Sequence, residues 1–224
     1  MKKLLITLDG PAGSGKSTTA KLLAKRLGYC YLDTGAMYRA ITLQAIHHGI
    51  FPTDPEKIIT MLPDITLHID YKDGRQQTFL NGWDVSEGIR SPEVTRHVSA
   101  VSAIAEVRTF LRQQQQHIGN QGGYVVDGRD IGTVVFPNAD IKFYMTAKVE
   151  ERARRRLKEM ADTDEWDLPK MIEDIQKRDH ADMTRAEAPL RQPPDAIVID
   201  NSLMTLDEQI QAIIAHIENR FGKQ

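Results

Sequence analysis

The sequence has a single cysteine, Cys30, among its 224 residues. One cysteine excludes an internal disulfide and favours the reducing environment of the cytoplasm, which is the location we expect. Aromatic residues are also scarce, at 6%, but hydrophobic residues make up 41% of the chain. That share is ordinary for a globular protein, and the length suits one domain over residues 1–224, or a core domain that carries a smaller insert.

A surplus of charge of either sign is absent as well. The chain has 29 Lys and Arg against 31 Asp and Glu, so its formal net charge is -2. Proteins that bind nucleic acid or an anionic membrane through a general basic field carry an excess of positive charge. We therefore expect neither nucleic acid nor a membrane as a partner, and any bound anion has to be held by local groups.

Long hydrophobic runs are missing too. No segment approaches the roughly 20 apolar residues that span a bilayer. Two lysines and an apolar run open the chain, but the run stops at Asp9, short of the hydrophobic part of a signal peptide, so we expect no signal peptide. The seven histidines show no metal-ligand spacing, and we therefore expect any metal ion to arrive with a substrate.

Short apolar runs alternate with helical patterns along most of the chain. The predicted strands are residues 4–8, 29–32, 124–126, 141–145 and 196–199. Such alternation predicts an α/β fold of three layers, with a central parallel sheet between two layers of helices. Ligands in these folds bind beyond the carboxyl ends of the strands, so the residues that follow each run are the candidates for a site.

The alternation is interrupted between about residues 64 and 88. Apolar and polar residues alternate there, and Asp73-Gly74 and Asn81-Gly82 are typical of tight turns between antiparallel strands. The segment is predicted to be a small antiparallel β insert.

Helical patterns return in the second half of the chain. Residues 150–160 are predicted to form a strongly charged helix, and residues 168–179 a further one. A last helix runs from Thr205 to about residue 220, because Thr205 and Glu208 form a capping-box pattern at its start.

The first predicted strand is followed by the phosphate-binding pattern G-x-x-x-x-G-K-[ST], matched at every position. Its glycines let backbone N–H groups turn towards one concave surface, and the N-terminus of the next helix adds partial positive charge. Lys16 can reach the β- and γ-phosphates of ATP, and the Ser17 hydroxyl can bind the accompanying Mg²⁺. The residues predicted to bind ATP are Gly10, Pro11, Ala12, Gly13, Ser14, Gly15, Lys16, Ser17 and Thr18.

This pattern predicts nucleotide binding without separating kinases from GTPases and ATPases. A GTPase is disfavoured, because the guanine-binding pattern Asn-Lys-x-Asp does not occur. A kinase needs a second anion site opposite the first. Thr34 and Arg39 follow the second strand, and Asp127, Arg129 and Asp130 follow the third, where an acid can be linked to Mg²⁺. Plain helix caps and turns with a local Asp–Arg pair use the same residues, so both interpretations stay open here.

A third group of candidates is basic. Arg152, Arg155 and Arg156 share one face of the charged helix, and Arg178 and Arg185 follow. Guanidinium groups suit the charge of a phosphoryl group in transfer, and a lid that carries them would exclude water from the reaction. The alternative is a solvated helix face that pairs with nearby glutamates.

Four segments together resemble the bacterial cytidylate kinase family. They are ITLDGPAGSGKS at residues 6–17, LDTGAMYR at 32–39, DGRDIGTVVFP at 127–137 and RAEAPL at 185–190. Their order and spacing and the total length agree with that family over essentially the whole chain. The resemblance implies a P-loop kinase that transfers a phosphoryl group from ATP·Mg²⁺ to CMP or dCMP, within pyrimidine nucleotide supply.

The resemblance also implies roles for individual parts of the chain. Residues 64–88 would contact the CMP and residues 150–185 would form the lid. Ser99, Arg108 and Asp130 stand at positions associated with cytosine recognition. The other residues implied to bind the acceptor nucleotide are Thr34, Tyr38, Arg39, Arg129, Arg178, Asp182 and Arg185. The residues that we predict to be catalytic are Lys16, Asp127, Arg129, Arg152 and Arg156.

Two other functions stay open on the sequence. One is a kinase for another monophosphate, UMP or AMP. The other is a non-kinase regulatory protein whose P-loop binds a nucleoside triphosphate and hydrolyses it slowly or not at all. We expect the protein to act as a monomer.

Overall fold

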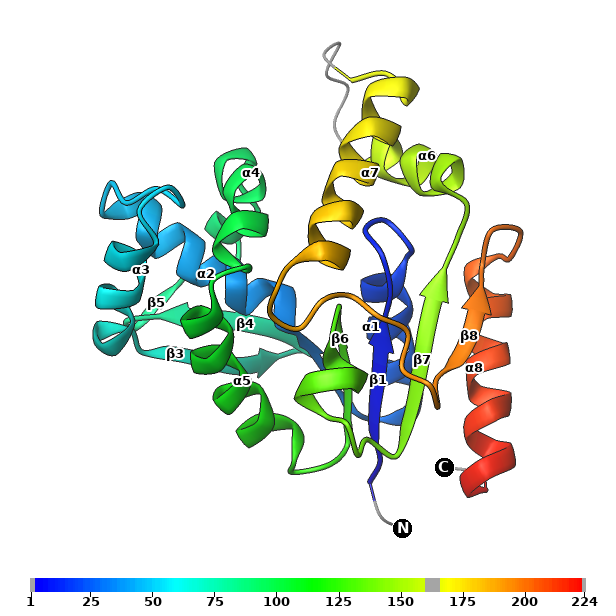
Figure 1. Cartoon of the computed structure of the whole chain (residues 1–224). Coiled ribbons are helices and arrows are strands. Elements are labelled where there is room, and N and C mark those ends of the chain that lie inside the picture. The colour runs from blue at the N-terminus through cyan, green and yellow to red at the C-terminus, as the bar shows by residue number, and fades with distance from the viewer. Residues whose placement is uncertain (1–2, 160–165, 223–224) are drawn as a thin grey trace.

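Five parallel strands form the central sheet of the computed structural model, which describes residues 3–159 and 166–222. The spatial order is β2-β6-β1-β7-β8, so β1 lies in the middle with β6 and β7 beside it (Figure 1). The strands are β1 (Leu5–Asp9), β2 (Cys30–Asp33), β6 (Tyr124–Gly128), β7 (Ile141–Thr146) and β8 (Ile197–Asp200). They match the five apolar runs to within about two residues, and the predicted parallel sheet is confirmed.

Helices cover both faces of this sheet. Successive side chains of a strand point to opposite faces, and Val125 and Val126 of β6 accordingly belong to two different core clusters. The two clusters explain why the strands are apolar at nearly every position, because neither face meets water. One face packs against α1 (Lys16–Leu27) and α8 (Leu206–Phe221). The other packs against α2 (Thr34–His47), α4 (Pro92–Val101) and α5 (Ala105–Gly119).

Local signals in the sequence set several helix ends. The side chain of Asp33 accepts a hydrogen bond from the Ala36 N–H and begins α2. Gly28 ends α1 in the left-handed conformation, with φ of 65°. The predicted capping box is present at the start of α8, where Thr205 and Glu208 each accept a hydrogen bond from the other's backbone N–H. The remaining helices and helical turns are α3 (Pro55–Met61), α6 (Val149–Glu159), α7 (Leu168–Thr184), η1 (Leu62–Asp64), η2 (Gly88–Arg90) and η3 (Ile131–Val135).

The predicted β insert is a second, antiparallel sheet. Its strands are β3 (Leu67–Lys72), β4 (Arg75–Leu80) and β5 (Trp83–Asp84), in the order β3-β4-β5. Asp73 and Gly74 join the first two strands with φ of 52° and 72°, and the Asn81-Gly82 turn also has positive φ at both residues. These turns match the right-handed twist of the strands that they connect. The antiparallel arrangement is therefore confirmed, while contact with CMP stays a prediction.

Helices α6 and α7 lie beyond the carboxyl ends of the central strands (Figure 1). They pack on each other through a small apolar cluster of Ala153, Met171 and Ile175. The second helix continues to residue 184, five residues past its predicted end, so Asp182 is helical. Residue 160 of the predicted charged helix and residues 160–165 of the predicted lid lie outside the described residues.

No helix within residues 3–159 and 166–222 is both long and apolar enough to span a membrane.

Candidate active site

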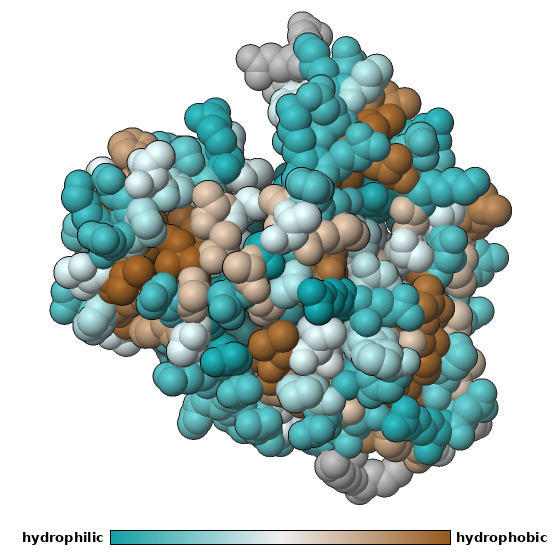
Figure 2. All heavy atoms as spheres, viewed as in Figure 1, coloured by the Kyte–Doolittle hydropathy of each residue, from teal (hydrophilic) through white to brown (hydrophobic). Residues whose placement is uncertain are grey.

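The loops that follow β1 and β6 and the start of α2, which follows β2, meet at one edge of the sheet. Leu8 of β1 and Asp33 of β2 both pair with Asp127 of β6, so the three strands end side by side. A cleft of about 670 Å³ opens above them, and Figure 2 shows the molecule hollowed between the α4 side and the α7 side. This edge is where the sequence predicted the ligands of a parallel sheet to bind.

The P-loop forms the floor of the cleft. Seven of its nine predicted residues line the cleft, while Gly10 and Pro11 lie beneath them, at the end of β1. Gly10 has φ of 150°, and a Cβ atom there would lie 2.1 Å from the carbonyl oxygen of Met145 in β7. Gly13 has φ of 71°. Only glycine suits both positions, because a side chain would collide with β7 at the first and strain the backbone at the second.

Lys16 is buried beneath the P-loop. Its Nζ donates hydrogen bonds to the Pro11 carbonyl oxygen at 2.8 Å and to Ser14 Oγ at 3.3 Å. Burial, with the nearby Arg129 guanidinium as a second cause, lowers the pKa of Lys16 to about 7. Both acceptors are uncharged. A bound phosphate would therefore give the ammonium group a negatively charged partner in direct contact.

This environment predicts that ATP binding takes up a proton at pH 8. A lysine with a pKa of about 7 is mostly neutral at that pH, and a phosphate beside it restores the charged form, so we expect net proton uptake when ATP binds. At pH 6 the lysine is already protonated and uptake should nearly vanish. Calorimetry in buffers of different ionisation enthalpy measures the exchange directly. Equal binding enthalpies in all buffers at pH 8 would contradict the prediction.

Ser17 and Asp127 provide adjacent oxygen atoms at the start of α1 and the end of β6. Ser17 Oγ donates to Asp127 Oδ2 at 2.7 Å, and the Tyr31 hydroxyl donates to Asp127 Oδ1 at 2.8 Å. Burial raises the pKa of Asp127, and the Asp33 carboxylate raises it further. Oxygen ligands of this kind suit Mg²⁺. Within the described residues no group of three or more His, Cys, Asp or Glu side chains could hold a metal ion, so nucleotide oxygens would have to complete this site.

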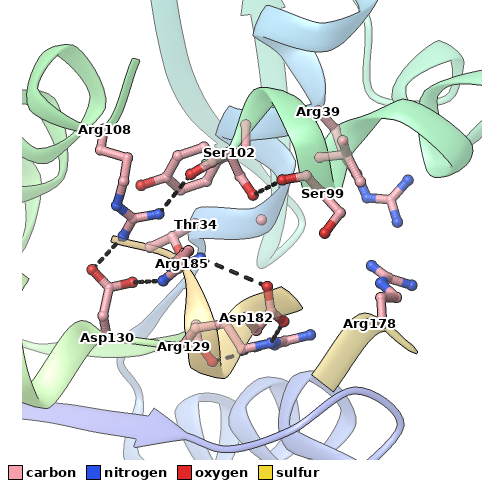
Figure 3. Close-up of a pocket in the computed structure, with 14 residues that line it drawn as sticks. Thr34, Arg39, Ser99, Ser102, Arg108, Arg129, Asp130, Arg178, Asp182 and Arg185 are labelled. Carbon is pink, nitrogen blue, oxygen red and sulfur yellow. Dashed lines mark hydrogen bonds and ion pairs between the residues drawn. The ribbon is translucent and has the colours of Figure 1, made fainter. Parts of the chain in front are cut away.

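A second cavity lies beside the P-loop and contains every residue predicted to bind the acceptor nucleotide. These residues come from α2, α4, α5, α7 and the loop segments after β6 and α7, so folding brings together parts of the chain that are far apart in sequence (Figure 3). The residues that line the cavity are Thr34, Gly35, Tyr38, Arg39, Val98, Ser99, Ser102, Arg108, Gly128, Arg129, Asp130, Arg178, Asp182 and Arg185.

One end of this cavity centres on Asp130. Its carboxylate lies 2.5 Å from Arg108 Nη2 and 3.2 Å from Arg185 Nη2, and all three side chains are buried. Arg108 also donates to the Ser102 carbonyl oxygen at 2.9 Å, and its buried Nε has no hydrogen-bond partner among the described residues. A buried acceptor and a buried donor side by side suit a ligand edge that carries both a donor and an acceptor.

The other end of the cavity is strongly cationic. The guanidinium groups of Arg39 and Arg178 face each other across it (Figure 3). Arg39 donates to the Ile89 carbonyl oxygen and to Thr95 Oγ1, and in the described part of the chain neither arginine forms an ion pair with a carboxylate. Burial lowers the pKa of Arg39 to about 10, with the charge of Arg178 as the next cause. Two half-buried like charges around one space favour an anion between them.

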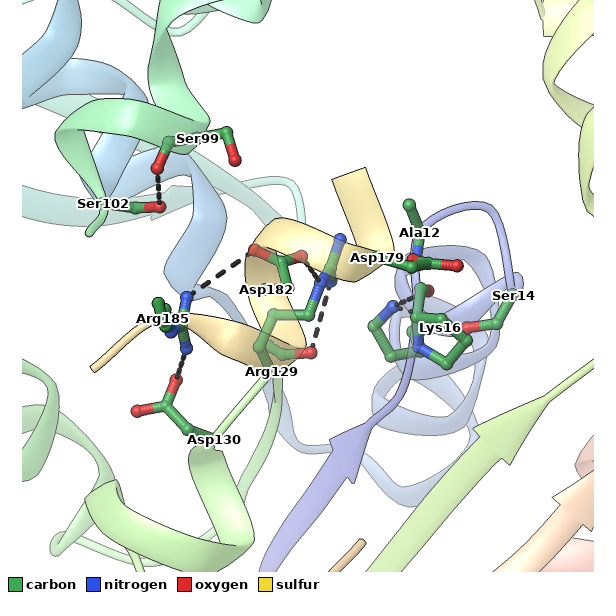
Figure 4. A network of polar contacts seen from close by, with 12 residues as sticks. Ala12, Ser14, Lys16, Ser99, Ser102, Arg129, Asp130, Asp179, Asp182 and Arg185 are labelled. Carbon is green, nitrogen blue, oxygen red and sulfur yellow. Dashed lines mark hydrogen bonds and ion pairs between the residues drawn. The ribbon is translucent and has the colours of Figure 1, made fainter. Parts of the chain in front are cut away.

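Arg129 lies between the two binding regions and lines both of them (Figure 4). Its Nε donates to Asp182 Oδ2 at 2.8 Å, and that carboxylate raises the pKa of the arginine despite burial. Thr34 anchors the end of β6 just before this loop, because its Oγ1 donates to the Asp127 carbonyl oxygen at 2.8 Å. The arrangement holds one permanent positive charge between the P-loop and the acceptor cavity.

Asp9 holds the loop after β6 against the base of the P-loop. Its buried carboxylate accepts hydrogen bonds from the N–H groups of Ile131 at 2.8 Å and Gly132 at 2.7 Å. Burial raises the pKa of Asp9 to about 7. Because Asp9 directly precedes Gly10, one carboxylate connects the strand that leads into the P-loop with the loop that carries Arg129.

Arg152, Arg155 and Arg156 of α6 were predicted to share one face, but their guanidinium groups have different surroundings. Arg156 lines the cleft and forms an exposed pair with Glu159 at 3.3 Å. Arg155 donates to Asn201 Oδ1 at 2.9 Å. Arg152 is buried and donates to the Ala12 carbonyl oxygen at 2.8 Å, so its guanidinium contacts the P-loop backbone outside the cleft. Helical spacing alone did not show this difference, and a catalytic role for either Arg152 or Arg156 stays a prediction.

Comparison with known proteins identifies the family. The family model described as "Cytidylate kinase" matches residues 6–219. The chain is also 49% identical to a cytidylate kinase of Caldicellulosiruptor bescii, over 96% of this chain and 95% of the relative. The chain belongs to the cytidylate kinase family. A cytidylate kinase of Parabacteroides distasonis is 48% identical over 99% of this chain and 100% of the relative.

Membership in the cytidylate kinase family makes this protein a kinase and confirms the resemblance inferred from the four motifs. Among solved structures, a shikimate kinase of Bacteroides thetaiotaomicron superposes with a TM-score of 0.50 at 12% identity, covering 95% of this chain and 97% of the other. At that identity the likeness concerns the fold alone, and it supports the three-layer P-loop architecture.

Among the polar residues that sequence reasoning missed, three have contacts that define this cytidylate kinase family member's site. Ser102 lines the acceptor cavity and Arg90 lines the cleft, where its Nη2 lies 2.5 Å from Asp33 Oδ2. Asp179 contacts the P-loop. None of them belongs to a local motif, and Arg90 and Asp179 meet their partners only when distant segments fold together. The one available signal was that Asp179 directly follows Arg178.

Proposed function

We propose that this protein transfers the γ-phosphoryl group of ATP to the phosphate of CMP or dCMP. The products are ADP and CDP or dCDP, so the reaction belongs to pyrimidine nucleotide metabolism. The main support is a pair of anion-binding surfaces that face each other across one cleft. The P-loop with Lys16 forms the first, and the guanidinium groups of Arg39, Arg129 and Arg178 form the second.

The reaction needs positioning and charge more than acid–base chemistry. An oxygen of the acceptor phosphate forms a bond to the γ-phosphorus, while the bond from that phosphorus to the β–γ bridging oxygen breaks. The attacking oxygen is already an anion, so no general base is required. The protein holds the two substrates in line. Lys16, Arg129 and Arg156 would stabilise the negative charge spread over the transferred group.

Ser17 and Asp127 would hold Mg²⁺ together with the phosphates of ATP. When bound, the ion neutralises part of the charge of the β- and γ-phosphates. Tyr31 keeps the Asp127 carboxylate oriented, because its hydroxyl donates to the oxygen that does not contact Ser17. Thr18 and the backbone N–H groups of the P-loop would hold the remaining phosphate oxygens.

The choice of base would depend on Asp130, Arg108 and Ser99. Cytosine carries an exocyclic amino donor beside ring acceptors, and Asp130 supplies an acceptor beside the donors of Arg108. Uracil presents a carbonyl oxygen in place of that amine, which would set two acceptors against each other in a buried site. A preference for CMP and dCMP over UMP follows, and the larger adenine of AMP would need a differently shaped cavity.

The insert and the lid complete the proposal. The insert at residues 64–88 would contact the acceptor side, since Gln76 Oε1 accepts a hydrogen bond from the Asp33 N–H beside the cleft at 2.8 Å. Residues 150–185 would act as the lid, because α6 and α7 border the cleft. Both anion-binding surfaces belong to one chain, so a single copy would suffice, and we propose a cytoplasmic monomer.

The test is ADP formation from ATP·Mg²⁺ with CMP, dCMP, UMP, AMP or no acceptor. We expect a rate that depends on CMP or dCMP and exceeds the rate with UMP or AMP by at least about a hundredfold, as for buried polar groups left unpaired by a wrong ligand. A higher rate with UMP or AMP would overturn the cytosine assignment and keep the kinase mechanism. Equal slow rates with every acceptor and with none would contradict phosphoryl transfer and favour the regulatory alternative.

A further inference from the structure

Three charged residues spaced three apart stand at the end of α7, with Asp179 and Asp182 in its last two turns and Arg185 directly after it. Together they contact two parts of the site (Figure 4). Asp182 pairs with Arg129, and Arg185 pairs with Asp130, both in the loop after β6. Asp179 contacts the P-loop. The three residues thus connect α7 to the donor side and the acceptor side at once, and Asp179 is the only contact of the three to the donor side.

Asp179 and Arg152 together bind both polar groups of one P-loop residue. Asp179 Oδ1 accepts from the Ala12 N–H at 2.9 Å, and Arg152 Nη1 donates to the Ala12 carbonyl oxygen at 2.8 Å. The same Nη1 lies 2.5 Å from Asp179 Oδ2, while Arg152 Nε donates to the Ala147 carbonyl oxygen at 3.0 Å. Asp179 is 7% exposed and Arg152 is 8% exposed. Solvent screens such a pair little, so its geometry is strongly preferred.

Asp179 and Asp182 lie three residues apart and so share one face of α7. The P-loop follows β1, and the loop with Arg129 follows its neighbour β6. Asp179 and Asp182, on one face of α7, therefore reach the loops of two adjacent strands. Arg178, directly before Asp179 in sequence, points into the acceptor cavity.

We infer that Asp179 is a positioning residue for the phosphoryl donor. With Arg152, it holds the Ala12 peptide of the P-loop at a set distance from α7, and so aligns the phosphates of ATP with the guanidinium groups that hold the acceptor. The effect of this alignment on catalysis rests on the proposed function. It assigns Arg152 to the P-loop backbone as half of a pair, in place of direct contact with the transferred group.

The test compares Asp179→Asn, Asp179→Ala, Arg152→Ala and the double alanine variant in the full chain. We expect Asp179→Ala to raise the KM for ATP about tenfold and to lower kcat by a similar factor, as for a misplaced substrate. The KM for CMP should stay within about twofold. Asp179→Asn should lose less, because its amide oxygen can still accept from the Ala12 N–H. The double variant should be no worse than either single alanine variant, since the two residues act as a unit.

Glu173→Gln is the matched control. Glu173 lies on the same helix, but its pair with Lys177 at 2.6 Å is exposed, so this variant should keep the kinetics of the parent. Binding of ADP, measured by calorimetry without acceptor, provides a second readout. Asp179→Ala and Asp179→Asn should both weaken it. That measurement tests the P-loop contact even if CMP proves to be the wrong acceptor, so it separates this inference from the proposed function.

Three results would overturn the inference. The first is unchanged ADP affinity and unchanged KM for ATP in a folded Asp179→Asn variant. The second is an equal rise in the KM values for ATP and CMP, which indicates a general loss of structure. The third is a double variant whose loss is the product of the two single losses, because Arg152 would then act on a substrate by itself.

Discussion

Replacing Lys16 with alanine is expected to lower kcat for CMP phosphorylation by about a thousandfold, the loss typical of a charge-stabilising donor at the reacting group. The lysine is buried directly beneath the P-loop, and among the described residues its Nζ donates hydrogen bonds only to the uncharged oxygens of Pro11 and Ser14. Its positive charge is therefore available to the β- and γ-phosphates. Steady-state ADP formation at saturating ATP and CMP measures the effect.

The fold should survive this substitution. Removing the ammonium group removes a charge that burial already disfavours, as the lowered pKa of Lys16 indicates. Circular dichroism and thermal unfolding would check this. Lys25→Ala is the matched control, because Lys25 lies in the exposed last turn of the same helix, α1. Full activity of the Lys16→Ala variant would overturn the P-loop assignment.

Arg129→Ala should damage mainly the acceptor side. We expect the KM for CMP to rise at least about tenfold and kcat to fall about a hundredfold, with a smaller change in the KM for ATP. The reason is its position, since the guanidinium lines both the acceptor cavity and the cleft and pairs with Asp182 at 2.8 Å. Separate titrations of ATP and CMP resolve the two KM values.

Two further variants make this result interpretable. Arg129→Ala can also lose stability, because it leaves Asp182 with the more distant Arg185, whose Nη1 lies 3.7 Å away. The loss should be smaller than the roughly 3–5 kcal/mol of a fully buried pair, because the Arg129 side chain is 22% exposed. Arg129→Lys keeps the positive charge but lacks the planar guanidinium group with its several donors. We expect this variant to restore stability more fully than it restores activity, both relative to Arg129→Ala. Arg96→Ala removes an exposed arginine of α4 and should behave like the parent. Kinetics of Arg129→Ala that equal those of the parent would remove Arg129 from the site.

The P-loop and the central sheet could be predicted because their signals are local. Gly10, Gly13, Lys16 and Ser17 are contiguous or nearly so, and the geometry they need is set by backbone conformation within one turn. The strands could be found as short apolar runs in the sequence, because a parallel sheet is buried on both faces. The turns of the insert were equally clear, since Asp73-Gly74 and Asn81-Gly82 suit left-handed backbone. Family resemblance then supplied the residues of the acceptor side, which no local pattern joins.

The partners of charged side chains could not be predicted. Arg152 and Arg156 are four residues apart on one helix and look equivalent in the sequence, yet Arg152 is buried against Ala12 and Arg156 faces the cleft. The difference arises because α7 packs against one side of α6 and brings Asp179 to Arg152. Charge and helical spacing give the direction of a side chain around its own helix, and they contain no information about which helix lies opposite.

The sequence by itself determined the α/β class, the P-loop, the antiparallel insert and the family, because backbone propensity and contiguous motifs act over a few residues. Tertiary structure alone decided how α7 meets the two loops at the ends of β1 and β6. It set Asp130 between Arg108 and Arg185, and it left Arg39 and Arg178 facing each other without an acid within the described residues. Electrostatic interactions depend on distance and burial, and both are defined only when remote segments have packed.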